Sequence, residues 1–121
     1  MNLAELFHLE TDLVNVPAGQ SLFTTGEAGG KMFVLLAGTA DVFVGGTLVE
    51  SAQPGTLLGE MALIDDAPRI ATVTATTDCQ FVPIDERRFH FLVAQTPNFA
   101  THVMKVMVDR LRRMDERLTA H

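Results

Sequence analysis

The chain has 121 residues, of which 47% are hydrophobic and 20% charged; this composition suits one domain with a modest core and excludes a disordered polypeptide. The longest apolar runs are too short to cross a membrane, and the N-terminus lacks the charged and apolar regions of a signal peptide. We therefore expect no membrane partner and a cytoplasmic location. A single cysteine, Cys79, excludes an intrachain disulfide framework.

The net charge of −6 is unevenly distributed. Twelve carboxylates and only two cations, Lys31 and Arg69, occur through Glu86, whereas seven cations and three carboxylates follow. An acidic body disfavours a nucleic-acid partner, because neutralising phosphates requires a clustered basic face. Arg69 is the one guanidinium in the first 86 residues.

The first element expected is a short amphipathic helix within residues 1–12, where Leu3, Leu6 and Phe7 stand at helical spacing. From residue 13 to 84, runs rich in Val, Thr, Leu and Phe alternate with glycine and proline. MFVLLAG, TADVFVG, IATVTAT and CQFVPI read as strands, and VGGT as a two-residue hairpin turn. Many short strands with close turns indicate a β-sandwich or barrel.

After residue 84 the pattern becomes helical, so two helices are expected within 85–120. Asp85 can cap ERRFHFLVAQ, and Thr96-Pro97 starts a helix that runs to about Leu118. The second helix repeats apolar residues in steps of three and four, which predicts a dimer seam; its members are Met104, Met107, Leu111, Met114 and Leu118. Packing of this stripe on the protein's own core is the alternative. Val103 and Val106 form a second stripe that could face the barrel.

The stretch GEMALIDDAPRIATVTA, residues 59–75, carries the clearest functional signal. EMALI is long enough for one helical turn, whose first N–H groups lack intrahelical partners and carry partial positive charge. We expect a strand starting at Arg69 to aim the arginine's guanidinium at an anion bound by this helical turn, because the arginine fork matches a phosphate. Glu60 could accept a hydrogen bond from a nearby sugar hydroxyl. A structural ion pair of Arg69 is the alternative, with Glu60, Asp65 or Asp66 as its partner.

The segment from Gly59 to Val73 closely resembles the phosphate-binding cassette of cyclic-nucleotide-binding domains, as found in the catabolite activator protein family and in regulatory subunits of cyclic-AMP-dependent protein kinase. GEAGGKMFVLLAGTADVFV resembles the glycine-rich turn and strands of the same family, and the long helix after Pro97 resembles its C-terminal helix. The resemblance implies one domain over residues 1–121: a mainly β fold, the cyclic-nucleotide-binding β-roll or jelly roll, over 13–84, with a short N-terminal and a long C-terminal helix.

The resemblance also implies a role for each cassette residue. Arg69 would pair with the cyclic phosphate, and the backbone N–H groups of Ala62 and Ile70 would complete its cradle. Glu60 would accept from the ribose 2′-hydroxyl, and Gly59 would let the ribose approach the backbone. The pocket would be lined by Met61 and Ala71.

Two departures from the family pattern concern the base. Ile70 lacks the hydroxyl that often accompanies guanine recognition, which favours cyclic AMP over cyclic GMP as the ligand. On the long helix, the positions that reach adenine in the catabolite activator family hold Met114 and Asp115. Met114 could stack on the base, and Asp115 could accept from its exocyclic amine.

We expect a regulatory sensor with no catalytic activity and no cofactor, in which binding shifts the C-terminal helix and so signals to a downstream protein. The sequence shows no helix-turn-helix segment after the long helix. The five basic residues between Lys105 and Arg117 are interleaved with carboxylates, so direct DNA binding by this chain is not expected. His8, His90, His102 and His121 show no metal-ligand spacing. Two rivals remain: a dimerisation module without a physiological nucleotide, and a pocket for another small anion.

Overall fold

The computed structural model describes residues 1–119, with side chains described through Glu116. Over this range the chain forms, in order, α1 (Leu3–Leu6), β1 (Val14–Val16), β2 (Ser21–Phe23), β3 (Lys31–Ala37), β4 (Ala40–Val44), β5 (Thr47–Ala52), β6 (Leu57–Leu58), α2 (Glu60–Asp65), β7 (Thr72–Ala75), β8 (Cys79–Asp85), α3 (Glu86–Gln95) and α4 (Asn98–Thr119). None of these helices combines the length and the apolar character that crossing a bilayer would demand.

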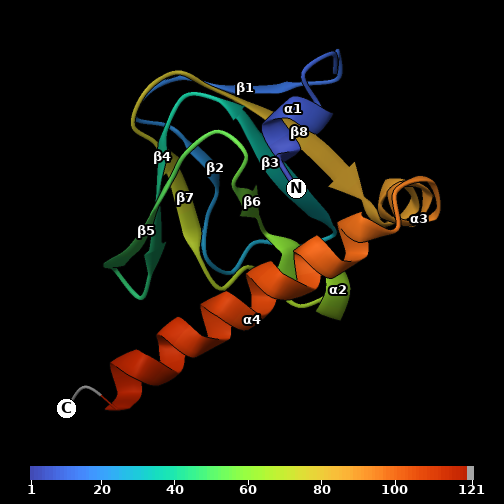
Figure 1. Ribbon diagram of the computed structural model, residues 1–121. Helices are drawn as coiled ribbons and strands as arrows, with labels where there is room; N and C mark the ends of the chain where they lie inside the picture. Colours follow the sequence, from blue (N-terminus) through green and yellow to red (C-terminus); the bar gives the residue numbers. More distant parts are fainter. Residues whose placement is uncertain (120–121) are drawn as a thin grey trace.

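The strands form two antiparallel sheets of four strands each, packed face to face (Figure 1). One sheet has the order β1-β8-β3-β6 and the other the order β2-β7-β4-β5. Gly45 and Gly46 join β4 to β5 with φ values of 57° and 79°, the left-handed geometry of a two-residue hairpin turn. The predicted β-roll and its hairpin are therefore confirmed.

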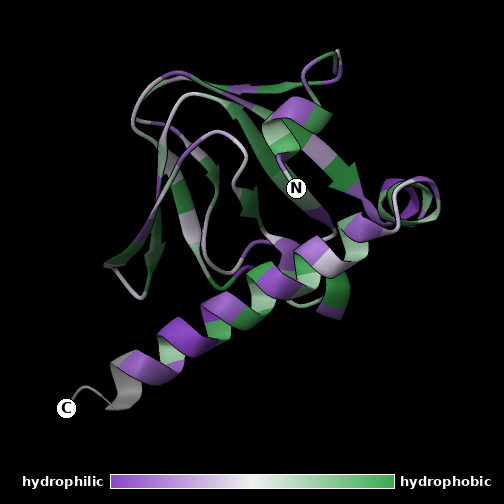
Figure 2. Cartoon of the chain, in the orientation of Figure 1, coloured by the Kyte–Doolittle hydropathy of each residue, from purple (hydrophilic) through white to green (hydrophobic). Residues whose placement is uncertain are grey.

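Two apolar clusters explain why β3 and β8 read as nearly continuous hydrophobic runs. Phe33, Leu35 and Phe81 point between the sheets, whereas Met32 and Ile84 point outward under the helices. Both faces of these strands are buried, so they lack the alternation of a half-exposed strand. Figure 2 shows the resulting hydrophobic colouring along much of β3 and β8.

The N-terminal helix is shorter than the predicted range of 1–12. Asn2 caps α1 through its side-chain oxygen, and Leu3 and Phe7 are buried as the helical spacing suggested. Leu6, however, is 42% exposed, and the chain leaves the helix after that residue. Further along, Glu10 pairs with Arg88 of α3.

The two C-terminal helices match their predicted starts. Asp85 caps α3 by accepting a hydrogen bond of 2.8 Å from the Arg88 backbone N–H. The long helix α4 then passes α2 toward the β4–β5 end of the molecule (Figure 1). Val103 is buried and Val106 packs against the same cluster, so the stripe predicted to face the barrel does so.

Candidate functional site

A cavity of about 480 Å³ lies between the β2-β7-β4-β5 sheet, α2 and α4. Its wall includes all seven cassette residues singled out in the sequence, namely Gly59, Glu60, Met61, Ala62, Arg69, Ile70 and Ala71. Most of the remaining wall is apolar, from Phe23, Val42, Val44, Val49, Leu58 and Val73. A few polar groups in a mainly apolar cavity is the usual composition of a small-molecule site.

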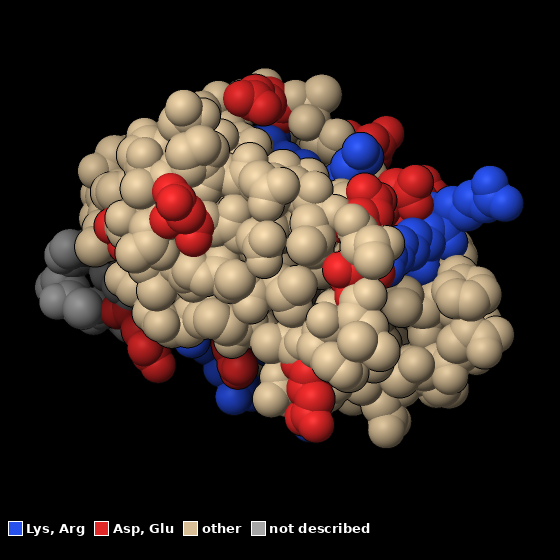
Figure 3. All heavy atoms as spheres, turned by 90° about the horizontal axis from the view of Figure 1, so that it is seen from above, with Lys and Arg blue, Asp and Glu red and all other residues tan. Residues whose placement is uncertain are grey.

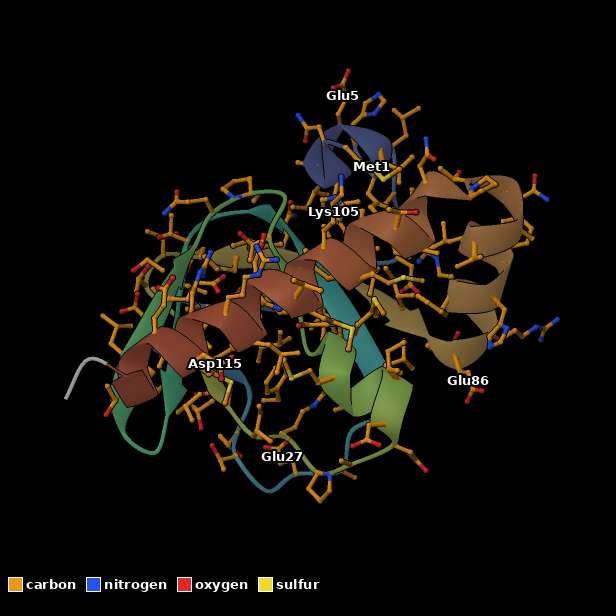
Figure 4. The ribbon with its side chains drawn as sticks, turned by 60° about the horizontal axis from the view of Figure 1, so that its bottom comes forward. Met1, Glu5, Glu27, Glu86, Lys105 and Asp115 are labelled. Carbon is orange, nitrogen blue, oxygen red and sulfur yellow. The ribbon has the colours of Figure 1, made fainter. Side chains whose placement is uncertain are left out.

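The sequence suggested that a strand starts at Arg69, but β7 begins only at Thr72, so Arg69 lies in a loop. Pro68, just before Arg69, has no N–H to donate to a neighbouring strand. The backbone of Arg69 pairs instead with the loop that contains residues 26–27. The Arg69 N–H donates to the Glu27 carbonyl at 2.8 Å, and the Gly26 N–H donates to the Arg69 carbonyl at 2.8 Å. Glu27 lies on this loop at the lower edge of Figure 4. The arginine is thus fixed by backbone pairing between two loops.

The Arg69 side chain is only 6% exposed and lies over the Phe23 ring, with Cζ 4.2 Å from the ring centre. Nη1 donates to the Gly59 carbonyl at 3.2 Å, whereas the buried Nε has no hydrogen-bond partner among the described residues. Burial lowers the pKa of Arg69, an effect that Glu27 and Glu60 partly offset. Its ordinary value lies so high that the guanidinium stays charged at neutral pH.

The alternative ion pair of Arg69 is wrong. Within residues 1–116, Arg69 forms no salt bridge with Glu60, Asp65 or Asp66. A buried cation without a bonded anion costs free energy, and proteins rarely keep one unless a ligand completes it.

Gly59 makes the close approach of Arg69 to α2 possible. Its φ of 76° lies in the left-handed region, and a Cβ at this position would stand 2.4 Å from Nη1 of Arg69. No other residue type meets both conditions without strain.

Glu60, at 2% exposure, is paired from α4. Its Oε1 accepts a hydrogen bond of 2.5 Å from Nη1 of Arg110, and Nη2 of Arg110 donates to the Leu57 carbonyl at 2.6 Å. Burial alone would lower the pKa of Arg110, but Glu60 and Glu50 raise it above its ordinary value. The site therefore includes a contact between the cassette and the long helix.

The sequence reasoning missed Arg110, Arg113 and Glu50, all of which line the cavity. The sequence did contain an indication for Arg110, because this residue lies four positions, about one turn, after Val106 and so continues the core-facing stripe of Val103 and Val106. A cation at a position expected to be buried suggests a partner inside. The interleaved charges of α4 instead suggested a solvated face.

Of the two adjacent positions predicted to contact the base, only one faces the cavity. Met114 lines the cavity and is 45% exposed, whereas Asp115 is exposed and outside the cavity wall. Neighbours in a helix point about 100° apart, so only one of them can face the ligand space. Asp115 projects from α4 in Figure 4.

The predicted dimer seam is divided in the same way. Met107 packs against the protein's own core cluster and Met114 lines the cavity, while Met104 and Leu111 are 61% and 53% exposed. The side chain of Leu118 lies outside the described part of the chain. The four described residues therefore do not form one continuous exposed face.

The chain matches the family described as Cyclic nucleotide-binding domain over residues 13–96. It belongs to that family. The Pycsar effector protein XpPycTIR of Xanthomonas perforans is 29% identical over 119 residues, which cover 98% of this chain and 39% of that protein. The chain spans less than half the length of the curated relatives that it matches.

Solved structures agree with this assignment. The catabolite activator protein of Thermus thermophilus superposes with a TM-score of 0.80 at 25% identity, over 93% of this chain and 61% of that one. A protein solved in work on a cyclic-GMP-dependent signalling pathway of bacterial phytopathogenesis gives a TM-score of 0.75 at 30% identity, over 92% of this chain and 94% of that one. The domain is thus a regulatory cyclic-nucleotide-binding β-roll of the catabolite activator type.

Proposed function

We propose that this chain is the sensor for a 3′,5′-cyclic nucleotide, with Arg69 as the phosphate-binding residue. The observation that carries the proposal is a buried guanidinium in the wall of a 480 Å³ cavity, whose Nε has no hydrogen-bond partner and which bonds no carboxylate among the side chains of residues 1–116. A cyclic phosphate supplies the missing acceptors and charge. Ala62 and Ile70 line the same cavity, and we propose that their backbone N–H groups add donors to the phosphate.

Glu60 is the proposed acceptor for the ribose 2′-hydroxyl, and Gly59 lets the ribose approach the backbone. Oε1 of Glu60 already accepts from Arg110, and Oε2 accepts no hydrogen bond from the described residues. A hydroxyl can therefore bind Glu60 without displacing the arginine. Met61 and Ala71 supply further apolar surface to the cavity wall.

The base then extends along α4 toward the β4–β5 hairpin, because Met114 stands one turn beyond Arg110. Met114, Val44 and Val49 offer it an apolar surface. We propose cyclic AMP over cyclic GMP, since Ile70 carries no hydroxyl for guanine. The relative from a cyclic-GMP-dependent pathway makes cyclic GMP the competitor to test.

The contacts of Arg110 suggest how binding reaches α4. The helix touches the cassette through Glu60, so a ligand that engages Glu60 changes the interaction free energy of α4 with the β-roll. We propose that the resulting shift of α4 is the signal to a downstream protein.

A panel of potential ligands tests the sensor proposal. We expect cyclic AMP to raise the midpoint temperature of thermal unfolding most, cyclic GMP to raise it less, and 5′-AMP or inorganic phosphate to raise it little. A ligand stabilises the native state only to the extent that it binds. Titration calorimetry then gives each dissociation constant. Equal effects of inorganic phosphate and cyclic AMP would favour a general anion site instead.

A dimerisation module remains the second candidate, because Met104, Val108 and Leu111 are 61%, 44% and 53% exposed on α4. This candidate predicts a stable dimer in sedimentation equilibrium that Leu111→Glu dissociates, together with no thermal shift from either cyclic nucleotide. A monomer that binds cyclic AMP would eliminate it.

A further inference from the structure

Glu50, on β5, is a partly buried carboxylate that contacts two arginines of α4. Its Oε2 accepts from Nη2 of Arg110 at 3.2 Å, and its Oε1 accepts from Nε of Arg110 at 3.4 Å. Oε1 also accepts from Nη1 of Arg113 at 3.1 Å. The Glu50 side chain is 19% exposed, whereas Arg113 is 54% exposed, so Glu50 is the inner member of the cluster.

The two contacts with Arg110 determine how its guanidinium is oriented. Glu50 bonds Nε and Nη2, which form one edge of the planar group, and this leaves Nη1 directed at Oε1 of Glu60. A side chain held on one edge by a carboxylate and by the Leu57 carbonyl has little freedom to rotate. Arg110 therefore reaches Glu60 through one nitrogen only.

The geometry points to Glu50 as a positioning residue for the ligand site. By holding one edge of Arg110, Glu50 keeps that arginine on Oε1 of Glu60 and leaves Oε2 for the ribose 2′-hydroxyl. This inference rests on the proposed function, because it assigns to Glu50 control over how well the site distinguishes ribose from 2′-deoxyribose.

The consequence of losing Glu50 follows from arginine geometry. A guanidinium freed on one edge prefers a two-point contact with a carboxylate, and Glu60 is the carboxylate beside it. That contact would occupy both oxygens of Glu60. The ligand hydroxyl would then compete with Arg110 for Oε2, although the phosphate contact at Arg69 would be unchanged.

The test compares cyclic AMP with 2′-deoxy-cyclic AMP by titration calorimetry on the full chain. The unaltered protein should prefer the ribose form by about tenfold or more, as expected for a hydrogen bond to a charged group. Glu50→Gln should reduce this preference at least about threefold, while the affinity for the 2′-deoxy ligand changes by less than about twofold.

Asp41→Asn is the matched control, since it removes one negative charge from β4 of the same hairpin and lies outside the cavity wall. It should keep the full preference for ribose. Combining Arg110→Gln with Glu50→Gln removes the guanidinium that would compete with the ligand for Oε2 of Glu60, so the double variant should regain the preference for ribose that Glu50→Gln loses. If circular dichroism shows that Glu50→Gln is misfolded, Glu50→Asp keeps the charge with a shorter reach and should give an intermediate preference.

Each outcome has a distinct meaning. An unchanged ribose preference in folded Glu50→Gln would overturn the positioning role while leaving the sensor function intact. An equal loss of affinity for both ligands would assign Glu50 a purely structural role, and so would also overturn the inference. Failure of the unaltered protein to bind either ligand would refute the sensor function itself, and the positioning role with it.

Discussion

Arg69 is the residue in which stability and binding oppose each other. Its guanidinium is buried over Phe23, its Nε has no hydrogen-bond partner in the described part of the chain, and burial lowers its pKa. In the ligand-free protein this charge is a cost that the fold does not offset by an ion pair. In the complex the same charge would meet a phosphate. Under the proposed function, the site keeps a destabilising group because that group binds the ligand.

Replacing Arg69 by methionine should separate these two effects. We expect Arg69→Met to weaken cyclic-nucleotide binding at least about tenfold, because a charge-assisted contact contributes roughly 1.5–3 kcal/mol. The unfolding free energy of the ligand-free protein should rise by about 1 kcal/mol, since an apolar chain over Phe23 carries no unpaired charge. Calorimetric titration and urea denaturation measure the two effects.

Arg87→Met, which alters an exposed arginine of α3, is the control and should change neither quantity appreciably. Unchanged nucleotide affinity in Arg69→Met would remove Arg69 from the phosphate site. A large loss of stability would show that the guanidinium supports the fold.

At the scale of elements, α4 has two halves held by different forces. Its first turns are anchored in the core by Phe99 and Val103, which are 0% and 2% exposed. Farther along, the contacts with the β-roll are mostly polar: Arg110 and Arg113 bond to Glu50, Glu60 and the Leu57 carbonyl. Apolar burial is harder to undo than partly solvated ion pairs, so the second half is the part that can move.

Hydrogen exchange should reveal this division. In the ligand-free protein, amides of residues 110–116 should exchange at least about tenfold faster than those of 102–107, because fewer apolar contacts oppose local opening there. Saturating cyclic AMP should slow residues 110–116 more than residues 102–107. Uniform protection along α4, with or without ligand, would contradict the proposed mobile half.

At the scale of the whole molecule, charge helps to join distant parts of the chain. Asp and Glu side chains are scattered over the face seen in Figure 3, and Lys and Arg side chains appear in several places on it, some directly beside acidic ones. Glu10, near the N-terminus, pairs with Arg88 of α3, and Arg88 also lies over the Phe7 ring with Cζ 5.6 Å from its centre. This contact fastens the N-terminal segment to the C-terminal helices.

The Glu10–Arg88 pair should make stability depend on pH. Burial raises the pKa of Glu10, but hydrogen bonds and the charge of Arg88 outweigh it and hold the pKa below its ordinary value. A carboxyl whose pKa is lowered by folding stabilises the protein above its ordinary pKa, and this stabilisation is lost as the pH falls below about 4.5.

We therefore expect Glu10→Gln to lower the unfolding free energy by about 1 kcal/mol at pH 7, with the difference from the unaltered protein shrinking toward pH 3. Urea denaturation at several pH values measures this. Glu5→Gln removes a carboxylate that projects into solvent (Figure 4) and should show no such pH-dependent difference. A constant difference from pH 7 to pH 3 would contradict the role of the ion pair.

The sequence alone determined the fold and the location of the site, because these depend on local signals. The runs that became β3, β4, β7 and β8, the Gly45-Gly46 turn and the Asp85 cap each act within a few residues. The cassette likewise places glycine, glutamate and arginine at short spacing. All seven cassette residues identified from the sequence line the cavity.

Only the tertiary structure decided what surrounds those residues. Arg69 pairs with a loop from residues 26–27, Glu60 is bonded by Arg110 fifty positions later, and Glu50 is held by the same helix. Local patterns carry no information on which charges meet across such separations, and α4 therefore read as a solvated or dimer-forming helix. Whether a charge on a helix faces water or a buried carboxylate depends on how that helix crosses the sheet, which is a property of the packed molecule.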